Sequence, residues 1–162
     1  IWVTEASGGD WGPRNWDDAL VTMGARVISM MNNWAQSAVL WNIALDTRGG
    51  PDYYYLCNDH THSSNRGLLT VDRRTGECTR NADYYALGHF SKFVPIGSHC
   101  ITSELREAQR LHAAAFATPD GAVAAVLCNE RVDPAALRID VHGRESQTLA
   151  LPARSLTTVV FD

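Results

Sequence analysis

The sequence of 162 residues lacks features that would point to several common classes of protein. Its longest apolar runs are Ala38–Trp41 and Ala122–Cys128, far shorter than the roughly 18 residues that a membrane-spanning helix needs. The 14 lysines and arginines are scattered along the chain, and 18 acidic residues outnumber them, giving a formal net charge of −4. Because nucleic-acid binders usually carry a basic patch, we expect no nucleic-acid partner and no transmembrane segment.

Strong motifs for metals, nucleotides and disulfides are also missing. Gly8-Gly9 and Gly49-Gly50 lack the surroundings of a phosphate-binding loop. Residues 57–62 read Cys-Asn-Asp-His-Thr-His, and Cys78 follows farther along the chain. Cysteine, histidine and aspartate side chains bind zinc, but their spacing here matches no strong zinc pattern. We therefore interpret this segment as an exposed polar loop, and we expect no metal and no cofactor.

The four cysteines include no Cys-x-x-Cys pair. Four cysteines allow three disulfide pairings, and the sequence does not choose among them. One pairing that we consider joins Cys57 to Cys78 and Cys100 to Cys128.

Aromatic residues divide the chain into two halves. All five tryptophans and all five tyrosines lie in residues 1–95, and residues 96–162 contain neither. The change falls at Pro95-Ile96-Gly97, where proline stops a helix and glycine permits a turn. We therefore predict two domains, 1–95 and 96–162.

Residues 1–95 alternate strand-like and helix-like segments. Ile1–Glu5 reads as a strand, and Ser37–Leu45 is a second apolar run of strand length. Between them, Asn15 is placed to cap a helix. The apolar residues of that helix recur at helical spacing: Leu20, Met23, Val27, Met30 or Met31, and Trp34. This order is typical of a parallel α/β sheet.

A second helix is predicted after a long loop. Gly49-Gly50-Pro51 ends the second strand, and the loop continues to about Asn81, which is placed to cap the helix. Four apolar residues share one face of it: Tyr84, Leu87, Phe90 and Val94. Two strands and two helices cannot close a sheet alone, so we interpret residues 1–95 as about a quarter of a (β/α)8 barrel.

Residues 96–162 read as short strands separated by turns. The expected strands are Ser98–Ser103, Leu111–Ala117, Ala122–Cys128, Leu137–Val141, Gln147–Leu151 and Leu156–Phe161. Six short strands with frequent turns are typical of an antiparallel β-sandwich. The fold class is therefore α/β plus all-β.

Two residues stand where a barrel carries its chemistry. Glu5 ends the first strand and Trp41 lies in the second, and side chains at the carboxyl ends of barrel strands line the active site. The tryptophan ring offers a flat apolar face for a sugar. The alternatives are a glutamate that only meets solvent and a tryptophan of the core.

Four motifs occur in an order known from one family. Residues 2–7 read Trp-Val-Thr-Glu-Ala-Ser, residues 40–46 read Leu-Trp-Asn-Ile-Ala-Leu-Asp, residues 49–51 read Gly-Gly-Pro, and residues 85–98 read Tyr-Ala-Leu-Gly-His-Phe-Ser-Lys-Phe-Val-Pro-Ile-Gly-Ser. Together they resemble the C-terminal portion of glycoside hydrolase family 30, which includes lysosomal glucosylceramidase and bacterial relatives. The resemblance is strong over residues 1–100 and looser beyond them.

The resemblance implies a retaining β-glycosidase with a (β/α)8 barrel, of which residues 1–95 are the last two units, and an attached β-sandwich. In such an enzyme Glu5 is the nucleophile, Trp41 is a wall of the sugar pocket, and Asn58 is a candidate for a further sugar contact. The acid/base glutamate of the family lies on strand four, which this chain does not contain.

The start of the chain fits this picture, because Ile1-Trp2-Val3-Thr4 is strand-like with no methionine or polar tail before it. We expect a C-terminal piece of a longer, exported enzyme that acts on a carbohydrate or glycolipid, and we expect the piece alone to be inactive. Its first partner is then the missing N-terminal part of the same enzyme. Two competing hypotheses are a catalytically silent carbohydrate-binding or scaffold piece, and a metal-binding module built on the loop between Cys57 and Cys78.

Overall fold

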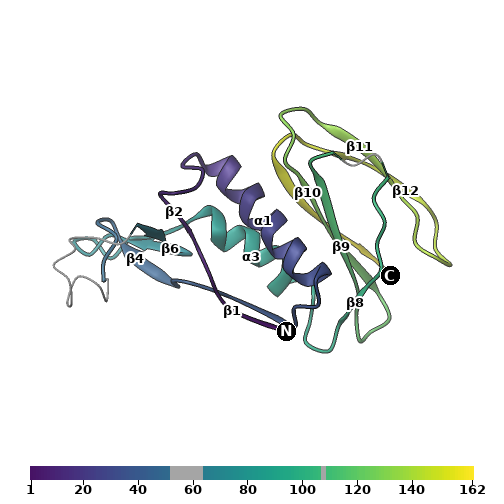
Figure 1. Cartoon of the computed structure of the whole chain (residues 1–162), viewed down its shortest axis with the longest axis horizontal. Coiled ribbons are helices and arrows are strands. Elements are labelled where there is room, and N and C mark those ends of the chain that lie inside the picture. Colours follow the sequence, from purple (N-terminus) through teal and green to yellow (C-terminus); the bar gives the residue numbers. More distant parts are fainter. Residues whose placement is uncertain (52–63, 107–108) are drawn as a thin grey trace.

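The computed structural model describes residues 1–51, 64–106 and 109–162 (Figure 1). It opens with strand β1 (Trp2–Ala6), helix α1 (Trp16–Asn32) and strand β3 (Ser37–Leu40). The two strands are parallel neighbours, with Trp2 opposite Ser37 and Ala6 opposite Leu40. The predicted strand–helix–strand order with a parallel pair is therefore confirmed.

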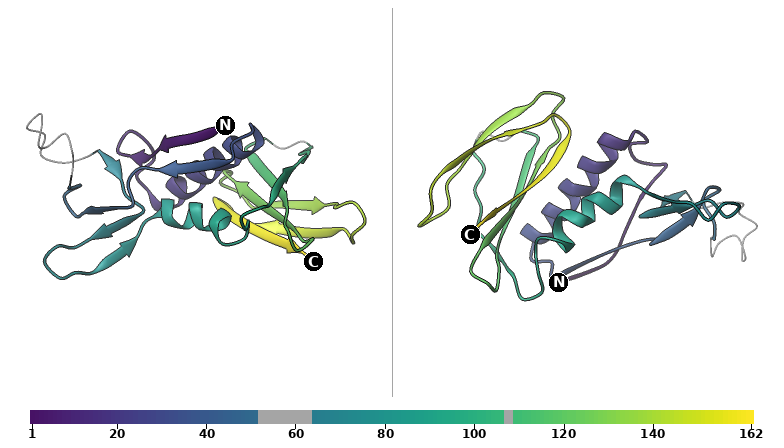
Figure 2. Two further views of the ribbon diagram at one scale, coloured as in Figure 1. Left: turned by 90° about the horizontal axis from the view of Figure 1, so that it is seen from below. Right: turned by 180° about the vertical axis from the view of Figure 1, so that it is seen from behind.

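Beyond the carboxyl ends of these strands lie two small sheets (Figure 2). In one, β2 (Gly8–Gly9) pairs with β5 (Asn65–Arg66). In the other, β6 (Leu69–Val71) lies between β4 (Ala44–Asp46) and β7 (Cys78–Arg80).

Two expectations for this region are wrong. The predicted strand 37–45 is two strands, β3 and β4. Between them the backbone leaves the line of β3 after Leu40, and the carbonyls of Asn42 and Ile43 accept hydrogen bonds from the backbone N–H groups of Leu68 (2.9 Å) and Leu69 (3.0 Å). The predicted loop up to Asn81 contains three short strands, β5, β6 and β7. Strands of two or three residues are too short to show a periodic pattern in the sequence.

The second half forms the strands of the predicted sandwich. Strands β8 (His99–Ile101), β9 (Leu111–Ala117), β10 (Val123–Asn129) and β13 (Ser155–Phe161) make an antiparallel sheet in the order β13-β10-β9-β8. Strands β11 (Ala135–Ile139) and β12 (Gln147–Leu151) form a separate antiparallel ribbon. All six predicted strands are present, with ends shifted by at most two residues.

The four-stranded sheet is apolar on both faces. On one face Ala114, Phe116, Val126 and Cys128 pack with buried residues of α1 and α3 (Ala82–Ser91). On the other face Ala125, Leu127 and Phe161 pack with Leu151 of the ribbon. Alternate residues of β10 therefore belong to two cores, and the helices share one core with the sheet across the change of composition at Pro95.

The helix caps and faces are partly as predicted. Asn15 caps α1, because its Oδ1 accepts from the backbone N–H of Asp18 at 2.8 Å, and Leu20, Met23 and Val27 are buried. Trp34 does not continue this face: it lies past the end of the helix at φ 70° and is 83% exposed.

The predicted face of the second helix is wrong at its start. Tyr84 is exposed, and α3 instead buries Ala82, Asp83 and Ala86 together with Phe90. The alanines allow close packing against α1. The side chain of Asn81 does not cap the helix; its Nδ2 donates to Gly67 O (2.8 Å) and to Thr70 Oγ1 (2.9 Å), which ties the start of α3 to β6.

The pairing of Cys100 with Cys128 is wrong, since both thiols are free. Cys100 lies opposite Phe116 of β9, whereas Cys128 lies opposite His112 near the other end of that strand. A disulfide needs Cα atoms within about 7 Å, and this register keeps the two cysteines farther apart. Burial raises the pKa of Cys128 to about 12. Cys78 is a free, exposed thiol, and Cys57 lies outside the described residues.

Candidate functional site

Glu5 and Trp41 lie together at the carboxyl ends of the parallel strands. Glu5 is the residue before the end of β1, and Trp41 directly follows β3. The backbone N–H of Trp41 donates to the carbonyl of Ala6 at 2.7 Å, so the two strands stay joined where these side chains emerge. Glu5 is exposed, and the Trp41 side chain is 46% exposed. A carboxylate and an aromatic face are thus both open to a ligand.

The chain next to Glu5 is fixed by a contact with the crossover helix. Arg26 of α1 donates from Nη1 to the carbonyl of Ser7 at 2.8 Å. Gly9 is buried, and a Cβ there would lie 2.4 Å from the carbonyl oxygen of Ser64. Only glycine, which has no Cβ, fits such a close approach. The Gly8-Gly9 segment, which the sequence shows as a loop, is therefore a place where two backbone segments pass very close to each other.

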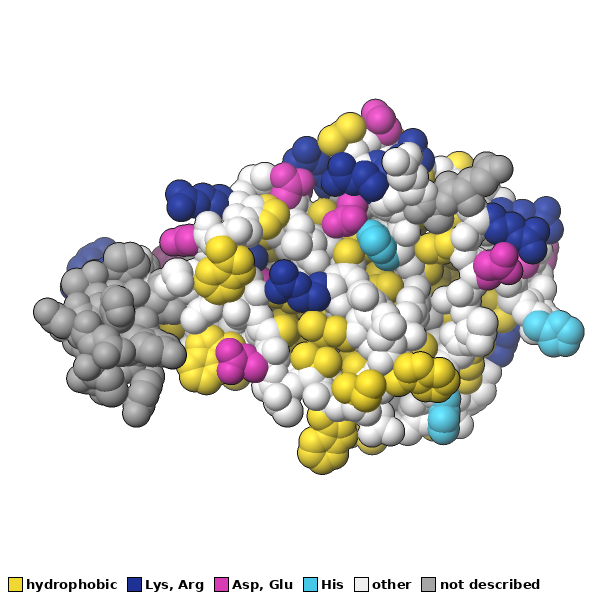
Figure 3. Space-filling view, in the orientation of Figure 1, with side chains coloured by type: hydrophobic (Ala, Val, Ile, Leu, Met, Phe, Trp, Pro, Cys, Tyr) yellow, Lys and Arg dark blue, Asp and Glu magenta, His cyan; other side chains and the backbone are white. Residues whose placement is uncertain are grey.

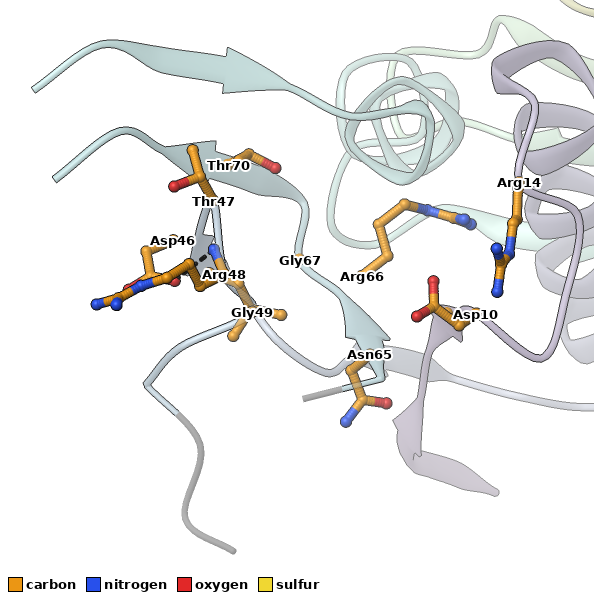
Figure 4. A pocket seen from close by; sticks show the side chains of 12 residues that line it. Asp10, Arg14, Asp46, Thr47, Arg48, Gly49, Asn65, Arg66, Gly67 and Thr70 are labelled. Atoms are coloured by element: carbon orange, nitrogen blue, oxygen red, sulfur yellow. Dashed lines mark hydrogen bonds between the residues drawn. The ribbon is translucent and has the colours of Figure 1, made fainter. Parts of the chain in front are cut away.

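An open groove of about 720 Å³ lies between the two small sheets, and Figure 4 shows its lining. Its walls come from the segment after β2, from the β4 end and from β5 and β6; they include Asp10, Arg14, Asp46, Arg48, Asn65 and Thr70. Sequence reasoning missed this groove. The available signal was Asp46 followed by Gly49-Gly50, a pattern in which an aspartate accepts hydrogen bonds from its own turn.

Asp46 is a buried carboxylate that organises one wall of the groove. Its Oδ1 accepts from the backbone N–H groups of Gly50 and Arg48, both at 2.8 Å, and its Oδ2 accepts from Arg73 Nη1 at 3.4 Å. The hydrogen bond from Gly50, followed by that from Arg48, lowers the pKa of the Asp46 carboxyl below its usual value of 3.8. The turn therefore depends on the ionised form.

This lowered pKa predicts a stability that depends on pH. The stabilisation by Asp46 is complete above the pKa of the unfolded chain and is lost as the pH falls through the lower pKa of the folded chain. In urea unfolding of the intact protein, Asp46→Asn should therefore lower stability at about pH 7, and the difference from the parent should shrink towards about pH 3. Asp17→Asn, at an exposed site, controls for loss of a surface charge. A difference that stays constant with pH would contradict the assignment.

Two sequence predictions fall on residues that the structure does not describe. Asn58, the candidate sugar contact, lies outside the described residues, as does the segment 57–62 of the metal hypothesis. Within residues 1–51, 64–106 and 109–162, no group of three histidine, cysteine or acidic side chains is arranged to hold a metal. No helix in the described part is both long and apolar enough to span a membrane.

Comparison with known proteins agrees with the resemblance. Residues 97–159 match the family model described as the glycosyl hydrolase family 30 beta sandwich domain. The chain is 30% identical over 136 residues to "Putative glucosylceramidase 3" of Caenorhabditis elegans, and 31% identical over 99 residues to "Lysosomal acid glucosylceramidase" of Mus musculus. These alignments cover 83% and 61% of this chain, but only 25% and 18% of the relatives.

Solved structures show the same fold. An endo-β1,6-glucanase matches 99% of this chain with a TM-score of 0.83 at 24% identity, and SrfJ from Salmonella typhimurium matches 99% with a TM-score of 0.85 at 20% identity. The chain covers 35% and 34% of those structures. This chain spans about a third or less of the length of each of these relatives and structures. Its residues 97–159 belong to the beta sandwich domain of glycosyl hydrolase family 30, and the chain as a whole is similar to a segment from the C-terminal part of enzymes of that family.

Proposed function

We propose that this chain is part of a retaining β-glycosidase in which Glu5 is the nucleophile and Trp41 is a wall of the sugar pocket. The observation that carries the proposal is the joint position of the two residues at the carboxyl ends of adjacent parallel strands, linked by the 2.7 Å bond from Trp41 N to Ala6 O. A nucleophile needs an accessible carboxylate, and Glu5 is exposed at the end of its strand.

The reaction needs two carboxyl groups, roughly 5–5.5 Å apart. Glu5 attacks the anomeric carbon and forms a glycosyl–enzyme ester, while an acid protonates the departing oxygen. The same second group then removes a proton from water, and the water oxygen displaces Glu5 from the anomeric carbon. We assign the acid/base to a part of the longer protein outside this chain. Asn58 remains our candidate for a further sugar contact.

The proposed architecture is a (β/α)8 barrel whose last two units are residues 1–95, followed by a β-sandwich of residues 96–162. Support comes from the parallel β1–β3 pair and from large apolar side chains left exposed in these strands or within three residues of them: Ile1, Trp2, Val39 and Ile43. Hydrophobic side chains are also visible at the surface in Figure 3. Further barrel strands beside β1 and β3 would cover such side chains.

The substrate class that we propose is a neutral β-linked carbohydrate or glycolipid. A relative from Trichoderma harzianum, 24% identical over 160 residues, is named an endo-1,6-β-D-glucanase, and the mouse relative is named a glucosylceramidase. The face of Trp41 suits the C–H face of a pyranose in both kinds of substrate. We also propose that the protein is exported, since one structural neighbour with a TM-score of 0.64 is named a conserved exported protein.

A mechanism-based label tests the nucleophile directly. Incubating the intact protein with an activated 2-deoxy-2-fluoro-β-glucoside should add one fluoroglucosyl group, because the fluorine slows the second step and the ester accumulates. Mass spectrometry of peptides should then place the group on Glu5. A label on another carboxylate would refute the assignment. No label on folded, full-length protein would favour the alternative of a catalytically silent carbohydrate-binding or scaffold protein.

A further inference from the structure

An exposed aromatic cluster lies at the beginnings of the two helices, away from Glu5 and Trp41 in the sequence. Trp16 is the first residue of α1, and Tyr84 and Tyr85 lie in the first turn of α3. The ring centres of Trp16 and Tyr85 are 5.6 Å apart, and those of Tyr84 and Tyr85 are 5.4 Å apart. We call these three residues the aromatic platform.

The platform remains open to solvent although its rings contact one another. Trp16, Tyr84 and Tyr85 are 48%, 38% and 43% exposed. The Tyr84 and Tyr85 rings meet edge-to-face, and the Trp16 and Tyr85 rings are tilted by 60°; ring contacts of this kind are favourable at these distances. Within the described part of the chain, neither tyrosine hydroxyl has a hydrogen-bond partner, which leaves polar groups beside the apolar faces.

An ion pair between the partly exposed Arg66 and the buried Asp83 keeps the two helix beginnings together. Arg66 of β5 binds the Asp83 carboxylate of α3 through Nε and Nη2, and its Nη1 donates to the carbonyl of Pro13, just before α1, at 3.3 Å. Asn15 then caps α1 immediately before Trp16. One arginine thus links the turn that starts α1 to the turn that starts α3, and so holds together the two helix beginnings that carry the platform.

The charges around the platform fit an uncharged ligand. Among the acids nearby in the sequence, Asp18 is paired with Arg154 (2.8 Å) and Asp83 with Arg66, which leaves Asp17. Arg80 lies over the ring of Tyr84, 5.2 Å from its centre. Arg14, two residues before Trp16, lines the groove together with Asp10 (Figure 4). Two carboxylates, of Asp10 and Asp17, and two guanidinium groups, of Arg14 and Arg80, give no net attraction for an anionic membrane or a phosphate, whereas both kinds of group can bind sugar hydroxyls.

We propose that the aromatic platform is a second carbohydrate-binding site, separate from the reacting centre, that binds pyranose units of a neutral polysaccharide. Figure 1 shows both helices beginning on the side of the molecule where β1 leads into β2. The platform residues lie in the first turns of these helices and Glu5 is the next-to-last residue of β1, so both are at this end of the molecule. A polymer held on the platform would stay near the carboxyl ends of the strands. The inference extends the proposed function but does not depend on Glu5.

Affinity electrophoresis tests the inference on the full-length protein carrying Glu5→Gln, with soluble β-1,6-glucan in the gel as the probe. Trp16→Ala with Tyr85→Ala should weaken the retardation and raise the dissociation constant roughly tenfold, because two stacking faces are removed. The matched control is Trp34→Ala, which removes an equally large exposed ring that has no aromatic partner in the described residues and should bind the glucan as the parent does. Tyr85→Phe should keep binding close to the parent value.

Three outcomes would overturn the inference: no retardation of the parent by the glucan, equal losses in the double variant and in Trp34→Ala, or binding of the parent to anionic vesicles that the double variant loses. Circular dichroism spectra and melting temperatures of all variants identify any loss caused by unfolding. If the double variant unfolds, Tyr84→Ala, which removes one exposed ring of the platform, decides the result: binding equal to that of the parent would overturn the inference. Failure of the Glu5 assignment would appear separately, as continued hydrolysis of the glucan by the Glu5→Gln protein.

Discussion

Replacing Glu5 with glutamine in the full-length enzyme should lower kcat for β-glycosides by at least about a thousandfold, because an amide cannot form the glycosyl–enzyme ester. The melting temperature should stay close to that of the parent, since Glu5 is exposed and its side chain makes no hydrogen bond or ion pair within the described residues. Initial rates with an aryl β-glucoside measure the effect. The matched control is Glu77→Gln, an exposed glutamate in the turn between β6 and β7, which should keep full activity.

The alanine variant separates a nucleophile from a residue that only orients substrate. With Glu5→Ala, sodium azide enters the space of the carboxylate, attacks the anomeric carbon and displaces the activated aryl leaving group. The product is a glycosyl azide of inverted configuration, which NMR identifies by its anomeric coupling. Substantial activity of Glu5→Gln without azide would refute the assignment. Rescue that yields an azide of retained configuration would also contradict direct attack by Glu5.

Removing the Asp83 carboxylate should cost about 3 kcal/mol of unfolding free energy, because it leaves the Arg66 guanidinium without its ionic partner beneath two helices. The Asp83 side chain is buried, and it binds Arg66 through two nitrogens. Urea unfolding of the intact protein with Asp83→Ala measures the loss. Asp140→Ala is the control: Asp140 also pairs with an arginine, Arg138 at 3.0 Å, but both side chains are exposed, so the loss should stay below about 1 kcal/mol.

A double-mutant cycle shows whether the effect of Asp83 belongs to the pair. Arg66→Ala combined with Asp83→Ala should cost clearly less than the sum of the two single changes, since the double variant leaves no unpaired charge. Equal losses in the Asp83 and Asp140 variants, or strict additivity of the two single changes, would show that the pair of Arg66 and Asp83 does not hold the helix beginnings.

Strands β9 to β13 of the second half were predictable because each has five to seven residues, long enough to be recognised as a strand, whereas the three residues of β8 lie inside the longer predicted strand Ser98–Ser103. In β10, Val123–Asn129, one set of alternate side chains enters the helix-side core and the other enters the ribbon-side core, yet the run remains recognisable as a strand. Asn15 was also predictable, because capping is a local interaction. The strands β5, β6 and β7 were not, since they depend on pairing between distant segments.

For the site, a pattern at strand ends indicated Glu5 and Trp41, and the structure brings the two strand ends together. The groove beside Asp46 and the aromatic platform were beyond sequence reasoning. Trp16 and Tyr85 are 69 positions apart by their numbers, and only the packing of α1 against α3 brings their rings together. Tyr84 was grouped with Leu87, Phe90 and Val94 on one helix face, but helical spacing does not show which face of a helix meets its neighbour, and Tyr84 is exposed.

The sheet with two apolar faces has a consequence for how this part of the protein is inherited. Helices α1 and α3 cover Phe116, Val126 and Cys128. A gene rearrangement that transferred residues 96–162 alone would therefore yield a sheet with one apolar face exposed to water. The unit that recombination can move intact must therefore include both helices, although the change of composition at Pro95 separates them from the strands.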